Sequence, residues 1–171
     1  KEINNYQDIC KYLNNGFVIL LIEDEPSKEK NVVAFLGELL PDIKVVIKHS
    51  ITSGKIEIRK NTYDHILLDM SLPLFDNDDM NYMDENEFET FGGISVLDEI
   101  DRLDKICKVI VITAFDILGE GNDKIDLPQI NKRLKHEYPQ IFVGTVFYNT
   151  SSLEWKDDMS HLLLNNANKE E

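Results

Sequence analysis

A short apolar run that ends in three consecutive acids constrains the fold of this chain more than any other feature. Residues 18–22 are all Val, Ile or Leu, and Glu23, Asp24 and Glu25 follow directly. Such a run is typical of a strand buried on both faces of a parallel sheet. Ligands of open α/β sheets bind beyond the carboxyl ends of the strands. The adjacent acids therefore indicate either a site for a hard divalent cation or the solvated start of a loop.

Two further apolar runs lead into polar residues. The predicted strand at residues 65–70 carries Asp69 near its end, and the predicted strand at residues 108–114 carries Thr113. Because parallel strands end at the same edge of a sheet, we expect Asp24, Asp69 and Thr113 to face one pocket.

Helical patterns alternate with the predicted strands. Parallel strands need such crossover connections, and the crossovers are right-handed. The alternation predicts an α/β fold, a flavodoxin-like, doubly wound, five-stranded parallel sheet in the order 2-1-3-4-5. The predicted strands are 18–22, 44–48, 65–70, 108–114 and 141–148, and the predicted helices begin at a Ser27 cap, near 53, near 93, at an Asp126 cap and at a Ser151 capping box.

The rest of the chain divides around this core, which we place at residues 17–164. Residues 1–16 contain an extra N-terminal helix, for which the sequence leaves open the roles of linker, dimerisation helix and clasp. Residues 165–171 form a tail that we expect to be frayed. Two long connections, 74–91 and 115–125, are predicted insertions, and connections of such length are usually functional or disordered.

The order of acid pair, single acid and threonine at three strand ends, with Leu72-Pro73 after the single acid, resembles the receiver domain of two-component response regulators. The resemblance spans roughly residues 17–164. It implies a phosphoryl group accepted on Asp69 with Mg²⁺, and signalling through protein contacts. Its implied partners are a histidine kinase or phosphotransfer protein and an output domain.

The resemblance also assigns the pocket residues. Asp24, Asp69 and the backbone carbonyl of Ser71 are implied Mg²⁺ ligands, and Glu23, one methylene longer than the usual aspartate, would act through a coordinated water. Thr113 is implied to donate its hydroxyl to a phosphoryl oxygen. The alternative for the acids is a metal-free acidic rim.

One position departs from the pattern. Receivers carry a lysine just after the fifth strand, where this chain places Asn149, give or take one residue. An amide donates hydrogen bonds but brings no charge, so the departure predicts weaker stabilisation of a phosphoryl group and a poorly compensated acid cluster. Lys156 is the nearest lysine, and its place inside the last predicted helix makes it a poor substitute. The usual switch position is left open among Thr145, Val146 and Phe147.

Charge and composition restrict the partners. The net charge is −14, and residues 61–101 contain twelve Asp or Glu without a Lys or Arg. Such a surface repels nucleic-acid phosphates and anionic lipids, which argues against direct binding to nucleic acid or membrane. The two cysteines have no metal-ligand spacing, and reduced thiols in the cytoplasm are the default expectation. A homodimer is left open.

Two other functions compete with a phosphorylated signalling domain. A degenerate receiver would bind proteins without ever being phosphorylated, and the missing lysine favours it. A Mg²⁺-dependent phosphatase of related topology would usually need a second acid two residues after the nucleophile, and that position is Ser71. We therefore expect a signalling protein rather than an enzyme.

Overall fold

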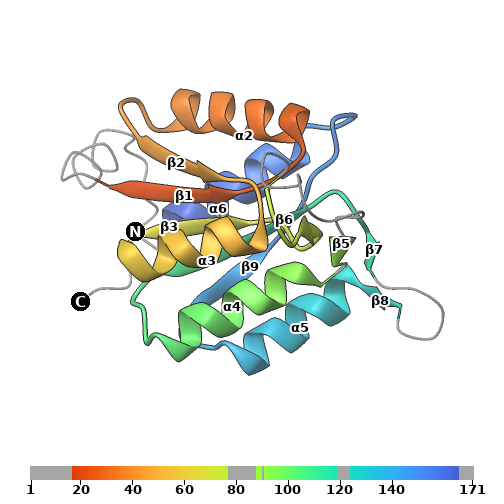
Figure 1. Ribbon diagram of the computed structural model, residues 1–171. Coiled ribbons are helices and arrows are strands. Elements are labelled where there is room, and N and C mark those ends of the chain that lie inside the picture. Colours follow the sequence, from red (N-terminus) through yellow and green to blue (C-terminus); the bar gives the residue numbers. More distant parts are fainter. Residues whose placement is uncertain (1–16, 77–87, 90, 119–123, 166–171) are drawn as a thin grey trace.

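The core of the protein is a five-stranded parallel sheet (Figure 1). The computed structural model describes residues 17–76, 88–89, 91–118 and 124–165. The strands lie in the order β2-β1-β3-β6-β9, which is 2-1-3-4-5 when these five strands are numbered along the chain. The predicted fold class is thereby confirmed. The strands are β1 (Val18–Ile22), β2 (Lys44–Lys48), β3 (His65–Leu68), β6 (Lys108–Thr113) and β9 (Phe142–Phe147).

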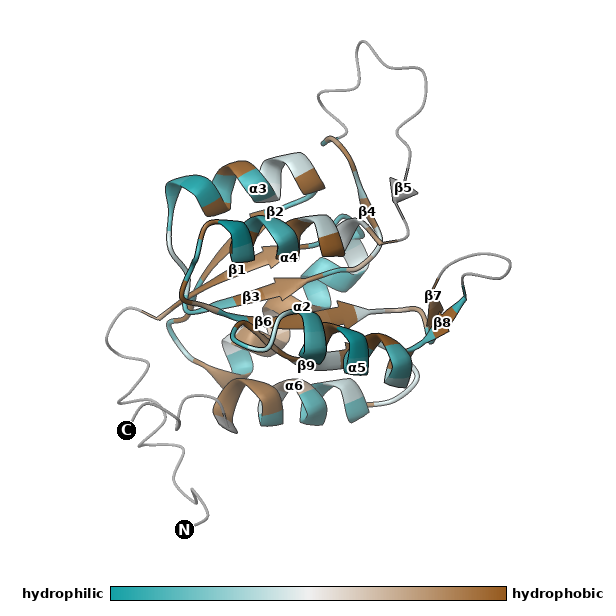
Figure 2. Ribbon diagram, turned by 90° about the horizontal axis from the view of Figure 1, so that it is seen from below, coloured by the Kyte–Doolittle hydropathy of each residue, from teal (hydrophilic) through white to brown (hydrophobic). Residues whose placement is uncertain are grey.

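Helices cover both faces of this sheet, which explains why its strands are apolar without alternation. One face is covered by α2 (Pro26–Leu39) and α6 (Glu154–Asn165), and the other by α3 (Ile51–Lys60), α4 (Gly92–Arg102) and α5 (Leu127–Glu137). Ile19 and Leu21 of β1 face the first pair of helices, and Leu20 and Ile22 face the other three. The strands are accordingly the most hydrophobic layer in Figure 2, and polar residues lie on the outer helical faces.

The start of α2 differs from the prediction. Glu25, and not Ser27, caps the helix, because its carboxylate accepts hydrogen bonds from the backbone N–H groups of Ser27 (2.9 Å) and Lys28 (2.7 Å). Pro26 then takes the first helical position, where its missing N–H is no loss. A carboxylate at this end also complements the helix dipole.

The other helix boundaries confirm one predicted cap and correct two starts. Asp126 caps α5, and its carboxylate accepts the Gln129 N–H at 2.9 Å. The α3 helix begins at Ile51, earlier than predicted, because Ser50 and Ser53 form a capping box. The α6 helix begins only at Glu154, so the predicted capping box at Ser151 is wrong. There the Ser152 N–H bonds to Asn149 O at 3.3 Å, which makes residues 149–152 a turn.

Both predicted insertions begin and end in short antiparallel pairs. In the first, β4 (Leu72–Pro73) pairs with β5 (Phe88–Glu89). In the second, β7 (Ile117–Leu118) pairs with β8 (Ile125–Asp126). Residues 77–87, 90 and 119–123, the predicted N-terminal helix and residues 166–171 of the predicted tail lie outside the described residues.

Among the described residues, no helix is both long enough and apolar enough to cross a membrane.

Candidate functional site

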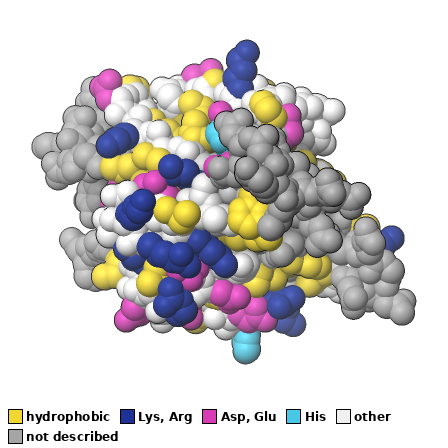
Figure 3. All heavy atoms as spheres, in the orientation of Figure 1, with side chains coloured by type: hydrophobic (Ala, Val, Ile, Leu, Met, Phe, Trp, Pro, Cys, Tyr) yellow, Lys and Arg dark blue, Asp and Glu magenta, His cyan; other side chains and the backbone are white. Residues whose placement is uncertain are grey.

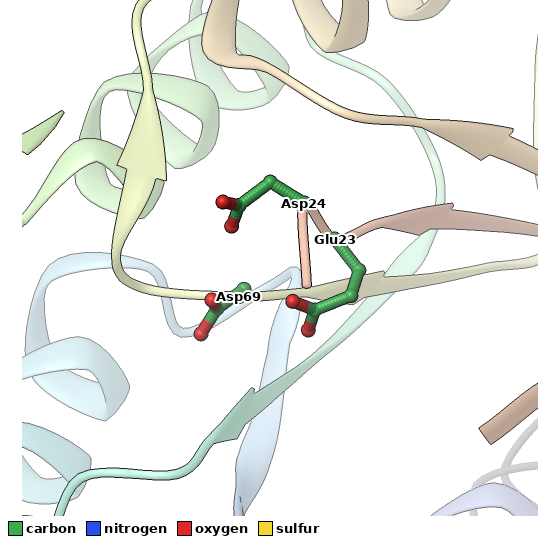
Figure 4. Close-up of side chains that lie close together, drawn as sticks. All are labelled: Glu23, Asp24 and Asp69. Atoms are coloured by element: carbon green, nitrogen blue, oxygen red, sulfur yellow. The ribbon is translucent and has the colours of Figure 1, made fainter. Parts of the chain in front are cut away.

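Three carboxylates meet at the carboxyl edge of the sheet. Oxygen atoms of Glu23, Asp24 and Asp69 all lie within 4.8 Å of one another, and Figure 4 shows the Glu23 and Asp69 side chains side by side with Asp24 next to them. The sheet hydrogen bonding continues into these residues, because Glu23 N bonds to Lys48 O (2.9 Å) and Asp69 N bonds to Ile22 O (3.0 Å). The predicted convergence of the acids is confirmed.

The acids differ in burial and in their backbone contacts. Glu23 is 0% exposed and Asp69 is 5% exposed, whereas Asp24 is only partly buried. Glu23 Oε1 accepts the Glu25 N–H at 3.0 Å, and Asp69 Oδ1 accepts the Met70 N–H at 2.8 Å. The strand ends thus hold two carboxylates inside the protein and leave Asp24 at the mouth of the cluster.

A lysine that the sequence analysis missed lies among these acids. Lys28, from the first turn of α2, is 2% exposed. Its Nζ lies 2.6 Å from Glu23 Oε2 and 3.1 Å from Asp69 Oδ1, and it donates a hydrogen bond to Ile112 O at 2.9 Å. The ammonium therefore has two carboxylate oxygens and one backbone carbonyl oxygen within 3.1 Å. The acid cluster therefore has a buried ammonium from α2, although no lysine follows directly after the fifth strand.

The charges in the cluster do not balance. Burial raises the pKa of Glu23 and of Asp69, and the Lys28 ammonium opposes this shift at both groups. Burial and the neighbouring Asp69 charge also raise the pKa of Asp24. Three carboxylates beside one ammonium carry two surplus negative charges when all are ionised. A divalent cation would compensate that surplus.

The first turn of α4 fixes the backbone on which Asp69 stands. Gly93 N bonds to Met70 O at 3.0 Å. A Cβ at Gly93 would lie 2.7 Å from Asp69 O and 3.0 Å from Met70 Cα, closer than atoms tolerate. Gly93 is therefore required for close approach of the helix to the segment after β3, a role beyond the turn that its sequence suggests.

Thr113 ends β6, and Asn149 lies two residues after the end of β9. Thr113 is 0% exposed, and its Oγ1 accepts the Phe115 N–H at 3.2 Å, so its hydroxyl hydrogen can be donated to another acceptor. Asn149 Oδ1 accepts the Ser151 N–H at 2.9 Å within the turn after β9. Between them in space, Tyr148 N bonds to Thr113 O at 2.8 Å and the Tyr148 ring centroid lies 6.0 Å from Lys28 Nζ.

Lys28 left a signal in the sequence. It precedes Val32 by four residues, and Leu36 and Leu39 continue the same buried stripe of α2. A lysine on the apolar side of a helix, one turn after an acidic strand end, indicates a charge directed into the protein. Lys156, the lysine nearest in sequence to Asn149, lies 3.8 Å from Glu38 instead.

Comparisons with known proteins give the fold a context. No family model matches the chain. It is 28% identical over 137 residues to the uncharacterized protein y4jR of Sinorhizobium fredii, covering 80% of this chain and 90% of that protein. It is 24% identical over 143 residues to the Detocs response regulatory protein DtcB of Enterobacter cloacae, covering 82% and 94%.

Solved receiver structures superpose on the chain. The response regulator TrrA of Thermotoga maritima, in complex with Mg²⁺ and BeF, matches with a TM-score of 0.53 and 17% identity over 85% of this chain and 98% of that one. The receiver domain of the sensor histidine kinase PA1611 of Pseudomonas aeruginosa, with a magnesium ion in its active-site cleft, matches with a TM-score of 0.53 and 19% identity over 85% and 95%. The chain therefore has the fold of a response regulator receiver domain.

Proposed function

We propose that this protein is a signalling receiver domain that accepts a phosphoryl group on Asp69 in the presence of Mg²⁺. The observation that carries the proposal is the cluster of Glu23, Asp24 and Asp69, whose oxygens lie within 4.8 Å of one another at the carboxyl edge of the sheet. The likeness to response regulators supports it.

The donor set fits Mg²⁺. Carboxylate oxygens are the hard ligands that this ion prefers, and the surplus negative charge matches a divalent cation. Asp24, Asp69 and the backbone carbonyl of Ser71 are the proposed ligands, with Glu23 acting through a water. Mg²⁺ would supply positive charge against the oxygens of the incoming phosphoryl group.

The chain's own residues position the reaction. A carboxylate oxygen of Asp69 forms the new bond to phosphorus, and the bond from phosphorus to the donor atom breaks. That atom is an imidazole nitrogen of a phosphohistidine or an oxygen of acetyl phosphate, and it leaves with the electron pair. Thr113 donates its hydroxyl hydrogen to a phosphoryl oxygen, and Asn149 contributes an amide. The phosphoryl group adds about −1.5 to −2 charges at Asp69. The proposed partners are a histidine kinase or phosphotransfer protein upstream and a protein or output domain downstream.

A second function is favoured by the Lys28 contacts. Because Lys28 pairs with both Glu23 and Asp69, part of the acidic charge is compensated internally. The same pocket is therefore compatible with a degenerate receiver that binds partners without phosphorylation.

Intact-protein mass spectrometry after incubation with acetyl phosphate and Mg²⁺ separates the two functions. A working receiver gains one phosphoryl group, and both Asp69→Asn and removal of Mg²⁺ abolish the gain. Asp157→Asn, which alters an exposed acid of α6, is the matched control and labels like the wild type. If the wild type binds Mg²⁺ but gains no phosphoryl group, the degenerate function is correct.

A further inference from the structure

We infer that Lys28 is the residue whose ammonium contacts the phosphoryl group on Asp69, so that α2 supplies the charge that the segment after β9 lacks. This inference rests on the proposed phosphorylation of Asp69. It assigns a role in the reaction to a residue of α2, far in sequence from Asn149, which follows β9. The contacts of Lys28, its environment and its position on α2 carry the argument.

The first step is the geometry of the ammonium. Lys28 Nζ lies 3.1 Å from Asp69 Oδ1, the atom of the predicted phosphoacceptor that also accepts the Met70 N–H. Any phosphoryl group bonded to the Asp69 carboxyl therefore forms within reach of this cation. A charge-assisted contact of this type is roughly twice as strong as a neutral hydrogen bond.

The second step is the way in which the ammonium is held. Glu23 Oε2 lies 2.6 Å from Lys28 Nζ, as an ion pair inside the protein, and Ile112 O accepts a hydrogen bond at 2.9 Å. The longer side chain of Glu23 thus has a partner of its own. Buried lysines are rare unless paired, so this arrangement holds the charge at the reacting carboxylate.

The third step concerns the end of β9. The Tyr148 ring stands 6.0 Å from Lys28 Nζ, and the Tyr148 hydroxyl accepts a hydrogen bond from Asn31 Nδ2 of α2 at 2.8 Å. Tyr148 is buried, and its contacts tie the end of β9 to α2 beside the lysine. The site is therefore approached by Lys28 from the α2 side, whereas Asn149, whose Oδ1 accepts the Ser151 N–H, has only an uncharged amide to donate.

The chemistry follows from the charge change at Asp69. When the bond from Asp69 oxygen to phosphorus forms and the donor atom leaves with its electron pair, the negative charge moves from the carboxylate to the phosphoryl oxygens. Lys28 can follow that charge with a small movement of its side chain. Its contact is then stronger in the transition state and product than a neutral amide would give.

A purely structural counter-ion would produce the same starting contacts, so the experiment must separate the two roles. We would measure the acetyl phosphate labelling rate at saturating Mg²⁺, and separately the Mg²⁺ affinity by calorimetry, for the wild type and Lys28→Met. Lys156→Met is the matched control, because it removes a partly buried lysine that pairs with Glu38 and not with the acid cluster.

The expected result is a labelling rate at least about tenfold lower in Lys28→Met, the effect of losing one charge-assisted contact. Mg²⁺ affinity should stay equal or increase, because a repelling cation has been removed from the acids. Lys156→Met should match the wild type in both measurements. A structural counter-ion would leave the labelling rate of the folded variant unchanged, and that result would overturn the inference.

A double variant guards against misfolding. Glu23→Gln with Lys28→Met removes one negative and one positive charge, so the pocket keeps its net charge. If the single variant fails to fold, the double variant decides by comparison of its labelling rate with that of Glu23→Gln alone, because Glu23 is itself part of the proposed Mg²⁺ site. Failure of the wild type itself to label, with Mg²⁺ bound, would refute the proposed function together with this inference. Normal labelling of the wild type and of the Lys28 variants would refute only the inference.

Discussion

Two charge clusters of this protein have opposite balances of acidic and basic groups. In the cluster at the carboxyl edge of the sheet, three acids lie together, and the Lys28 ammonium pairs with two of them. Burial raises the pKa of each of the three acids. In the second cluster, one acid, Glu99, is held by two arginines, and their hydrogen bonds lower its pKa to about 2. Acid is in excess in the first cluster and compensated in the second.

The second cluster joins two helices at the surface. Glu99 of α4 contacts Arg59 of α3 at 2.6 Å and Arg102 of its own helix at 2.8 Å, and both arginine side chains are at least half exposed. Figure 3 shows Lys and Arg side chains gathered on this face. The difference teaches that an ion cluster in which the acid is fully paired serves to connect elements, whereas a buried surplus of negative charge indicates a place for a ligand.

The largest effect is expected from removing the one cation of the acid-rich cluster. Lys28→Met leaves Glu23 and Asp69 buried without the cation that pairs with both, which should lower the free energy of unfolding by about 3 kcal/mol. Denaturant titration without Mg²⁺ measures this loss, and added Mg²⁺ should restore part of it by mass action. A loss as small as that of Lys156→Met would mean that the acids take up protons and that no surplus charge exists.

A buried group without any partner extends the comparison to the other end of β3. His65 is 3% exposed, neither ring nitrogen has a hydrogen-bond partner among the described residues, and Phe17 packs on its ring. Burial lowers the pKa of His65 from 6.5 to about 4, with Lys108 adding to the shift and Asp64 opposing it.

The pH dependence of stability follows from that direction. Above pH 6.5 neither state of His65 is protonated, so the shift has no effect on stability. As the pH falls toward about 4, His65 binds a proton in the unfolded chain but not in the folded protein, so stability is lost. Relative to His65→Leu, the wild type should lose about 3 kcal/mol across this window. Exposed His161→Leu is the control, and parallel pH profiles for the wild type and His65→Leu would show that His65 is solvated.

A smaller effect is expected at Asp24, the most exposed acid of the surplus cluster. Asp24→Asn removes one repelling charge, so without Mg²⁺ the variant should be more stable than the wild type by about 1 kcal/mol. The same change should abolish the thermal shift that several millimolar Mg²⁺ produces. Thermal melts with and without Mg²⁺ test both parts. An equal Mg²⁺ shift in variant and wild type would exclude Asp24 as a ligand.

The fold could be predicted from the sequence because burial on both faces produces continuous apolar strands, and Val18 to Ile22 is such a strand. The meeting of Asp24 and Asp69 followed from the parallel arrangement. Lys28 was missed because the direction of a long side chain depends on tertiary packing, even where its place on the α2 stripe is visible. Glu25 was missed as a cap because glutamate is not one of the common cap residues, whereas Ser27 is.

The short ladders at the bases of the insertions had no sequence signal of their own. Pairs as brief as Leu72–Pro73 with Phe88–Glu89 have too few residues for an alternating pattern. The roles of Ser71, Thr113 and Asn149 likewise remain predictions, because a phosphoryl group, and not the fold, would reveal them.

The smallest effect is expected in the compensated cluster, at Glu99. Glu99→Gln removes its charge but keeps its shape, and the two arginines regain solvent because they are already half exposed. Exposed pairs contribute little, so the melting temperature should fall by a few degrees at most, and by less at high salt. Mg²⁺ affinity and labelling of Asp69 should not change, since this cluster holds no surplus negative charge. If Glu99→Gln altered Mg²⁺ binding as strongly as Asp24→Asn, the two clusters would be energetically coupled through α4, whose Gly93 lies against the Asp69 backbone. The distinction between a cluster that connects helices and a cluster that binds a ligand would then fail.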